Sequence, residues 1–212
     1  MQFYVQNAVK NSRARIGVLT TPHGIVQTPV FMPVATAGAV KTLSTDEVKA
    51  LGTEIILGNT YHLHLRPGEN LIKNAGGLQK WMNWDGPILT DSGGYQAFSL
   101  GATRTKQAKT TDEGVQFYSH LDGKKLFLTP EAVIDIQLNL GSDIVMVLDD
   151  CAPYPASEKR LRAAVKRTGE WARRSIDHWN SADHSFAVGS SSPAWLQASR
   201  SSSLVSPELD TV

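Results

Sequence analysis

The sequence predicts an α/β protein built around a parallel sheet. Three short apolar runs, within residues 54–62, 87–96 and 141–153, each end in polar side chains, and helical patterns separate them. The run at residues 144–148 shows no alternation of apolar and polar residues, which is typical of a strand buried on both faces. Strands of this kind that alternate with helices indicate a parallel sheet covered by helices.

An antiparallel unit is expected ahead of this sheet. Residues 3–5 and 14–19 are strand-like, and the turn signal TPHG at 21–24 precedes a further run at 24–27. A turn signal between two strand-like runs favours a hairpin. The first strand of the main sheet is expected within residues 28–35, with a proline at its end or at a bulge.

Two short helices are expected between the early strands. Ser44 and Glu47 have the spacing of a capping box, and Gly52 follows as a stop signal. A second helix is expected within residues 66–76, opened by Pro67 and closed by glycines.

An insertion and a better marked helix follow the strand that ends at Asp91. The dipeptide Asp-Gly at 122–123 lies between apolar runs, which predicts an antiparallel hairpin between this strand and its helix. In the helix at 129–140, Thr129 is the expected cap, Pro130 takes the first position and Gly141 ends it.

The longest helical pattern covers residues 157–180. The expected buried face consists of Leu161, Ala164, Val165, Thr168, Trp171, Ala172 and Ile176. The opposite face is rich in Lys and Arg. Solvation of this basic face is favoured over RNA contact, because charged faces are common on amphipathic helices.

The composition changes at residue 181. Ten serines occur in residues 181–212, and strand and helix patterns stop there. We therefore expect one domain over 1–180 and a Ser-rich tail over 181–212 that is disordered or out of frame with the fold. Four strand-helix units are recognisable, whereas a closed parallel barrel needs eight.

Composition excludes several classes of protein. The 21 basic and 20 acidic side chains leave a net charge of +1, so a nucleic-acid partner would have to be held by a local patch. Cys151 is the single cysteine, which excludes a disulfide framework and a cysteine cluster for a metal. His62 and His64 are expected to be packed side chains rather than metal ligands. Without a leader or a long apolar run, a cytoplasmic location and no membrane partner are expected.

The stretch around Asp91 is the first candidate site. A buried strand delivers this carboxylate to the rim of the sheet, and Gly93 and Gly94 leave the backbone free to approach a flat ligand. Ligands of parallel-sheet enzymes lie beyond the carboxyl ends of the strands. Alternatively, Asp91 caps the next helix or forms an Asx turn, and Tyr95 belongs to the core.

The other two strands end in polar groups as well. Asn59 follows the run at 55–58, and Asp149, Asp150 and Cys151 follow the run at 144–148. Three such strands define one rim. Alternatively, Asp149 caps the turn before Pro153, Asp150 faces inward in its place, and Cys151 is a small buried apolar residue.

Six short motifs together resemble a known family, the tRNA-guanine transglycosylases of the bacterial queuine tRNA-ribosyltransferase type. They occur in the order and spacing of that family, at residues 58–63, 65–68, 90–96, 113–115, 128–130 and 141–146. The resemblance implies a (β/α)8 TIM barrel with an N-terminal antiparallel sheet, present here as an incomplete barrel. It also implies a transferase that exchanges the guanine at the tRNA wobble position for 7-aminomethyl-7-deazaguanine in queuosine biosynthesis.

The resemblance assigns roles to the residues of the rim. Breaking a bond between ribose and base builds positive charge on the sugar, so one carboxylate must face that carbon while another handles protons. Asp91 matches the general acid/base, and the remaining matches bind substrate: Ser92, Gly93 and Gly94 form the turn, Tyr95 stacks on the purine, Asp149 reads the base, and Cys151 and Asn59 lie beside them.

The chain departs from the family pattern in its later part. The covalent Asp nucleophile and the Cys and His zinc ligands of the family are not found after residue 180, so no metal or other cofactor is expected in this chain. Asp150 stands where glutamate is usual. The expected partners are tRNA and the 7-deazaguanine base, and the family forms dimers. A non-catalytic purine- or RNA-binding fragment and an inactive truncation product remain the alternatives.

Overall fold

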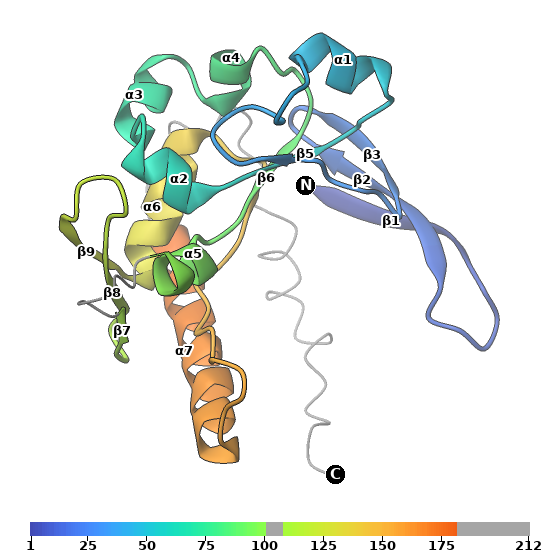
Figure 1. Ribbon diagram of the computed structural model, residues 1–212. Helices are drawn as coiled ribbons and strands as arrows, with labels where there is room; N and C mark the ends of the chain where they lie inside the picture. Colours follow the sequence, from blue (N-terminus) through green and yellow to red (C-terminus); the bar gives the residue numbers. More distant parts are fainter. Residues whose placement is uncertain (101–107, 182–212) are drawn as a thin grey trace.

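The computed structural model describes residues 1–100 and 108–181. In Figure 1 an antiparallel sheet lies to one side of a central parallel sheet, and the long last helix runs away from that sheet beside a second antiparallel unit. The expected tail at 181–212 lies outside the described residues from position 182 onward.

The N-terminal sheet has three antiparallel strands in the order β1-β2-β3. They are β1 (Gln2–Ala8), β2 (Arg15–Thr21) and β3 (Gly24–Thr28). Leu19 pairs with both Phe3 and Val26, and the register shifts between Val5 and Asn7. The expected hairpin of β2 and β3 is confirmed, and the strand-like run at residues 3–5 is part of β1, the third strand of this sheet.

The central sheet has four parallel strands whose order follows the chain, β4-β5-β6-β10. They are β4 (Val34–Ala35), β5 (Ile56–Gly58), β6 (Ile88–Thr90) and β10 (Ile144–Val145). Ala35, Gly58, Thr90 and Val145 lie in register across the sheet. In the described part of the chain this sheet is open, with β4 and β10 at its edges, and no closed barrel forms.

The last parallel strand is shorter than the sequence predicts. Only Ile144 and Val145 join the ladder, and Met146 is exposed. The expectation that residues 144–148 form a strand buried on both faces is therefore wrong. Within the described residues β10 has a single strand neighbour, β6, so the pattern was right about a strand that begins at Ile144 and wrong about its length and its burial.

Seven helices accompany the strands in the described residues. They are α1 (Thr45–Ala50), α2 (Thr60–Leu65), α3 (Glu69–Asn74), α4 (Leu78–Met82), α5 (Gly94–Ser99), α6 (Pro130–Leu140) and α7 (Glu158–Ser181). Two of them begin as predicted. Ser44 and Glu47 form the reciprocal capping box of α1, and the Thr129 hydroxyl accepts the Ala132 N–H at 3.1 Å to cap α6.

The short helix expected over 66–76 starts later than predicted. Pro67 precedes the helix instead of opening it, and α3 begins at Glu69 with Gly68 as its N-cap. The short helices α2 and α5 were not expected. They follow β5 and β6, where the pattern indicated polar residues at the rim of the sheet.

The predicted insertion is confirmed. Strands β7 (Lys109–Thr110), β8 (Val115–Tyr118) and β9 (Lys125–Leu128) form an antiparallel sheet in the order β7-β8-β9. It follows α5 rather than β6 directly.

The long helix α7 is confirmed, although its buried face differs from the prediction. Ala164, Trp171 and Trp179 are buried. Leu161 is exposed and Val165 is 74% exposed, so these two expected core positions are corrected. The buried face of α7 is the one that packs on α6, and the first turns of α7 extend beyond that helix (Figure 1).

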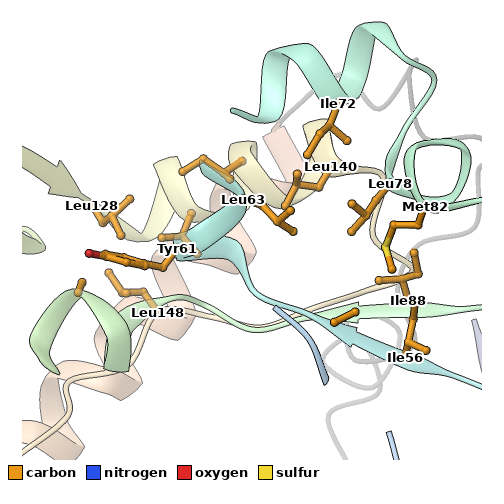
Figure 2. Packing of buried hydrophobic residues seen from close by; sticks show 14 of the residues in the cluster. Ile56, Tyr61, Leu63, Ile72, Leu78, Met82, Ile88, Leu128, Leu140 and Leu148 are labelled. Carbon is orange, nitrogen blue, oxygen red and sulfur yellow. The ribbon is translucent and has the colours of Figure 1, made fainter. Parts of the chain in front are cut away.

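The core fills the space between the central sheet and the helices. In Figure 2, Ile56 and Ile88 of the sheet lie near Leu78 and Met82 of α4, and Tyr61 lies between Leu128 and Leu148. The helices thus cover one face of the sheet and fix the strands, and the strands in turn position the polar groups that follow them.

Candidate active site

Asp91 links the ends of two neighbouring strands. Its N–H donates to the Gly58 carbonyl at 3.2 Å, which extends the ladder between β5 and β6 by one bond. Its carboxylate accepts the N–H groups of Thr60 at 3.0 Å and Gly93 at 3.1 Å, and the Asn59 side-chain amide at 2.5 Å. The bond from Gly93 is the Asx turn that the sequence left open, but the N-cap of α5 is Gly93 and not Asp91. The carboxylate is therefore held from three sides.

Burial raises the pKa of Asp91 above its ordinary value. The hydrogen bonds from Thr60, Gly93 and Asn59 act in the opposite direction, and the nearby charge of Asp149 adds to the increase. A carboxyl group with a raised pKa holds and releases a proton closer to neutral pH. Asp91 is thus suited to acid–base chemistry.

Asn59 orients Asp91 and begins the next helix. Its side-chain oxygen accepts the His62 N–H at 3.1 Å as the N-cap of α2, and its amide nitrogen donates to Asp91. The side chain is buried. Both ends of the amide are engaged within the protein, which makes Asn59 a positioning residue in this structure.

The turn after Asp91 connects the two acidic groups. The Ser92 hydroxyl donates to Asp149 Oδ1 at 3.1 Å and accepts the Gly94 N–H at 3.2 Å. A Cβ at Gly94 would lie 3.0 Å from the same Asp149 oxygen. At Gly93, where φ is 71°, a Cβ would lie 2.9 Å from the backbone nitrogen of Tyr61. The glycines are therefore required for the close approach of the two strand ends.

Asp149 and Cys151 lie on the other side of this turn. The Cys151 thiol donates to Asp149 Oδ2 at 3.2 Å. Burial raises the pKa of the Cys151 thiol to about 12, and the hydrogen bond and charge of Asp149 act in the same direction. Cys151 is thus a protonated hydrogen-bond donor beside the carboxylate.

Of the two consecutive acidic residues, only Asp149 faces the turn. Asp150 points to α7, where Arg160 binds it through both terminal nitrogens at 2.5 and 2.9 Å and Arg167 binds it at 2.5 Å. Burial would raise the pKa of Asp150, but these two guanidinium groups outweigh it and lower the pKa. The alternative that Asp150 faces inward at the site is excluded.

Three arginines of α7, Arg160, Arg167 and Arg174, pair with carboxylates outside this helix. Arg167 also binds Asp112 at 2.9 Å, and Arg174 binds Glu131 at 2.7 and 2.8 Å. Part of the basic face thus holds α7 against neighbouring segments, while its other basic residues are exposed as expected: Lys159, Arg162, Lys166 and Arg173.

Gln137 supports the site and was missed by the sequence analysis. It is fully buried on α6, and its side-chain amide accepts the Met146 N–H at 2.9 Å and donates to the Met146 carbonyl at 2.8 Å. The Thr90 hydroxyl donates to the same side chain at 2.9 Å. Gln137 thus takes the place of a neighbouring strand along the segment that leads to Asp149. The only signal in the sequence was one polar side chain among the apolar positions of this helix.

The aromatic and histidine residues near the rim divide into exposed and packed groups. Tyr95 is 62% exposed and does not belong to the core, so its ring is free to stack on a ligand. His62 packs edge-on to Tyr61, with ring centroids 5.2 Å apart, and His64 binds Glu69 at 2.8 Å. The two histidines are packed as expected.

Residues 1–100 and 108–181 contain neither a metal-binding cluster nor a membrane-spanning helix. No three His, Cys, Asp or Glu side chains there converge in a way that could hold a metal ion. These residues therefore form no ligand set for the zinc that the family resemblance implies. None of the helices in the same part of the chain is long and apolar enough to cross a membrane.

The fold and the site define a class of protein. It is an α/β protein that presents two carboxylates, joined by a Ser-Gly-Gly turn, beyond the carboxyl ends of a parallel sheet. Ligands of such sheets bind at this end of the strands.

Comparison with known proteins identifies the family. The family model described as queuine tRNA-ribosyltransferase matches residues 10–205, so the chain belongs to this family. It is 58% identical to the queuine tRNA-ribosyltransferase of Desulforudis audaxviator and 57% identical to that of Desulforamulus reducens, over 84% and 80% of this chain. A third relative of the same name, from Natranaerobius thermophilus, is 53% identical over 84% of the chain.

These matches cover 47%, 45% and 47% of the three relatives. The chain thus spans about half the length of the curated relatives that it matches.

Proposed function

We propose that this chain carries the base-recognition part of a tRNA-guanine transglycosylase. The reaction is exchange of the guanine at the tRNA wobble position for 7-aminomethyl-7-deazaguanine, a step of queuosine biosynthesis. The observation that carries the proposal is the Ser92 hydroxyl, which joins the turn after Asp91 to Asp149. It brings two carboxylates together at one rim of the sheet.

The proposed binding of the base uses Asp149 and Tyr95. A purine with an N1–H and an exocyclic amine offers two adjacent donors, and one carboxylate accepts from both. The hydrogen bonds from Ser92 and Cys151 hold the Asp149 carboxylate in place and leave it further lone pairs. The exposed ring of Tyr95 would stack on the flat base.

The proposed chemical role belongs to Asp91. Cleavage of the bond between ribose and base needs a group that handles protons and a group that faces the sugar carbon. The raised pKa of Asp91 supports the first role. Among the described residues we assign the proton-handling role to Asp91, and we assign no residue to the group that faces the sugar carbon.

We further propose that the central sheet is one part of a (β/α)8 barrel. In such barrels successive parallel strands are neighbours and helices cover the outer face. The order β4-β5-β6-β10 follows this rule, and the sheet has two open edges in the described residues. The matched relatives are about twice as long as the matched region, which leaves length for further units.

Two measurements test the function. Calorimetric titration of guanine into the 212-residue chain is expected to show binding that Asp149→Asn abolishes and Asp91→Asn retains. Incorporation of labelled guanine into tRNA is expected for a longer protein that contains these residues, and is lost on Asp91→Asn. We expect no incorporation by the chain alone, because only the proton-handling group is assigned to it.

A control substitution separates the site from general loss of charge. Asp85→Asn removes an exposed carboxylate that pairs with Lys49 at 2.9 Å, far along the chain from Asp149. This variant should bind guanine as the unchanged chain does. If Asp149→Asn and Asp85→Asn bind guanine equally well, the proposed site is wrong. If guanine binds but the longer protein performs no exchange, the alternative of a purine-binding protein without catalysis is favoured.

A further inference from the structure

The segment that carries the two consecutive aspartates lies beyond the end of the sheet. β10 ends at Val145, and residues 146–153 belong to neither a strand nor a helix. Gln137 holds the start of this segment at Met146, three residues before Asp149. The ladder of the sheet therefore does not fix which way the aspartate side chains point, and the contacts of the segment with α7 take over this role.

The helix α7 binds Asp150 at three points. Thr168 Oγ1 accepts the Asp150 N–H at 3.0 Å, and the Asp150 carboxylate accepts from Arg160 and from Arg167. In Figure 1 the segment after β10 runs along the first turns of α7, which reach beyond α6. One helix thus binds both the backbone and the side chain of the same residue.

The three anchoring residues lie on one side of α7. Arg167 and Thr168 follow Arg160 by about two helical turns, so their side chains are stacked along the helix. Trp171, one turn further along the same side, is fully buried and donates through Nε1 to the Asp112 carbonyl at 2.7 Å. This side of the helix is therefore held by contacts that do not involve the aspartates.

The residues on either side of Asp150 point away from α7. The Ser92 hydroxyl donates to Asp149 Oδ1 at 3.1 Å, and the Cys151 thiol donates to Asp149 Oδ2 at 3.2 Å. Such alternation is that of an extended segment, in which a shift by one residue moves every side chain to the opposite side. Because positions 149 and 150 carry the same side chain, the side chains themselves do not oppose this shift.

We propose that α7 sets the register of the two aspartates, with Arg160, Arg167 and Thr168 as positioning residues that hold Asp150 and thereby make Asp149 the carboxylate that faces the turn. The two arginines could pair with either carboxylate, whereas the Thr168 hydroxyl binds the backbone and so fixes the position of the segment. The consequence for binding of the base rests on the proposed function, in which Asp149 reads the base.

Cys151 is the single cysteine of the chain and reports the orientation of Asp149 without any ligand. Burial raises the pKa of its thiol to about 12, Asp149 adds to the increase, and the charge of Arg160 lowers it. Loss of the Arg160 charge alone would therefore slow the reaction of the thiol with iodoacetamide. Movement of Asp149 away from the thiol would accelerate the same reaction, so the two effects have opposite signs.

Iodoacetamide labelling of the 212-residue chain at pH 8 tests the register. Thr168→Val should accelerate labelling about fivefold, the effect of one neutral hydrogen bond, and Arg160→Gln about tenfold, the effect of a charge-assisted one. Thr168→Ser keeps the hydroxyl and should label like the unchanged chain. Arg162→Gln is the matched control, because it removes an arginine of the same helix whose side chain is 79% exposed, and it should leave the rate unchanged.

Urea separates a change of register from general unfolding. Reaction through the unfolded chain increases with urea, because unfolding exposes a large surface, whereas reaction of the folded chain should be nearly independent of urea below the unfolding transition. The proposal is overturned if Thr168→Val and Arg160→Gln label no faster than the unchanged chain, if their faster labelling increases with urea in this range, or if Arg162→Gln accelerates labelling equally.

Guanine titrations of the same variants connect the register to the proposed function. Thr168→Val and Arg160→Gln should weaken guanine binding about fivefold and tenfold, whereas Thr168→Ser and Arg162→Gln should not. Faster labelling of the first two variants, in a chain that binds no guanine, would support the register and refute the proposed function. Guanine binding that neither variant weakens would overturn the role of α7 and leave the proposed function intact.

Discussion

Substitution of Asp150 by asparagine should destabilise the protein strongly. The Asp150 side chain is 1% exposed, and its two partners, Arg160 and Arg167, are 30% and 20% exposed. Asparagine keeps the volume of the side chain but removes its charge, so two guanidinium groups lose their buried counter-ion. Loss of one partner of a buried ion pair costs about 3–5 kcal/mol. Because both arginines reach some water, we expect about 3 kcal/mol, the lower end of that range.

The free energy of unfolding that Asp150→Asn removes should depend on pH in a defined direction. Arg160 and Arg167 lower the pKa of Asp150, so its contribution to stability is present above the ordinary pKa of 3.8 and is lost as the pH falls through the lower folded-state pKa. The free energies of unfolding of the Asp150→Asn variant and the unchanged chain should therefore differ near neutral pH and converge in acid.

Urea unfolding followed by circular dichroism measures this difference, and Glu158→Gln is the control. Glu158 and Arg162 form an ion pair on the same helix, α7, but their side chains are 77% and 79% exposed. Such a surface pair contributes about 0.5 kcal/mol or less. Equal losses in the two variants, or a loss below about 1 kcal/mol for Asp150→Asn, would refute the reasoning. Guanine binding should weaken in Asp150→Asn as well, because the neighbouring Asp149 loses its anchor.

Three further predictions concern the candidate active site. Gly93→Ala should lower the free energy of unfolding by about 2–3 kcal/mol, because a Cβ there would meet the backbone of α2, whereas Gly123→Ala, with a similar φ of 72° and nothing within 4 Å, should cost about 1 kcal/mol. Cys151 should react with iodoacetamide at pH 8 about a thousandfold more slowly than an ordinary thiol, because its pKa is about 12, and Asp149→Asn should accelerate the reaction; fast labelling of the unchanged chain would contradict this. Asp91→Asn should gain stability relative to the unchanged chain as the pH rises from about 4 to about 7, because the raised pKa of Asp91 makes its ionised form unfavourable when folded; urea unfolding at both pH values checks the sign.

Features that depend on a few neighbouring residues were predictable from the sequence. The capping box of Ser44 and Glu47, the limits of α6 at Thr129 and Gly141, and the hairpin around Asp-Gly at 122–123 are all present. The two helix caps join residues three positions apart, and the strands of the hairpin are neighbours in the chain, so the local pattern contains the whole interaction. The placement of polar residues after parallel strands was predictable for the same reason, because the apolar runs mark the strands.

Features that depend on distant residues were decided by the tertiary structure alone. The sequence could not choose between Asp149 and Asp150, because the choice depends on Arg160 and Arg167 of α7, which lie 10 and 17 residues after Asp150 in the chain. The role of Gln137 could not be predicted from the sequence either. Gln137 hydrogen-bonds to Met146, which follows β10, and in the described residues β10 has only β6 as a strand neighbour.

The sequence could not predict which apolar side chains of α7 are buried. Leu161 and Val165 fit the apolar pattern of α7 as well as Trp171 does, yet only Trp171 is covered. Periodicity states which side chains share a face, but whether that face is covered depends on which elements pack there, and this is a property of the whole chain. The sequence thus determined the elements and the polar residues at their ends, while long-range packing determined which carboxylates meet.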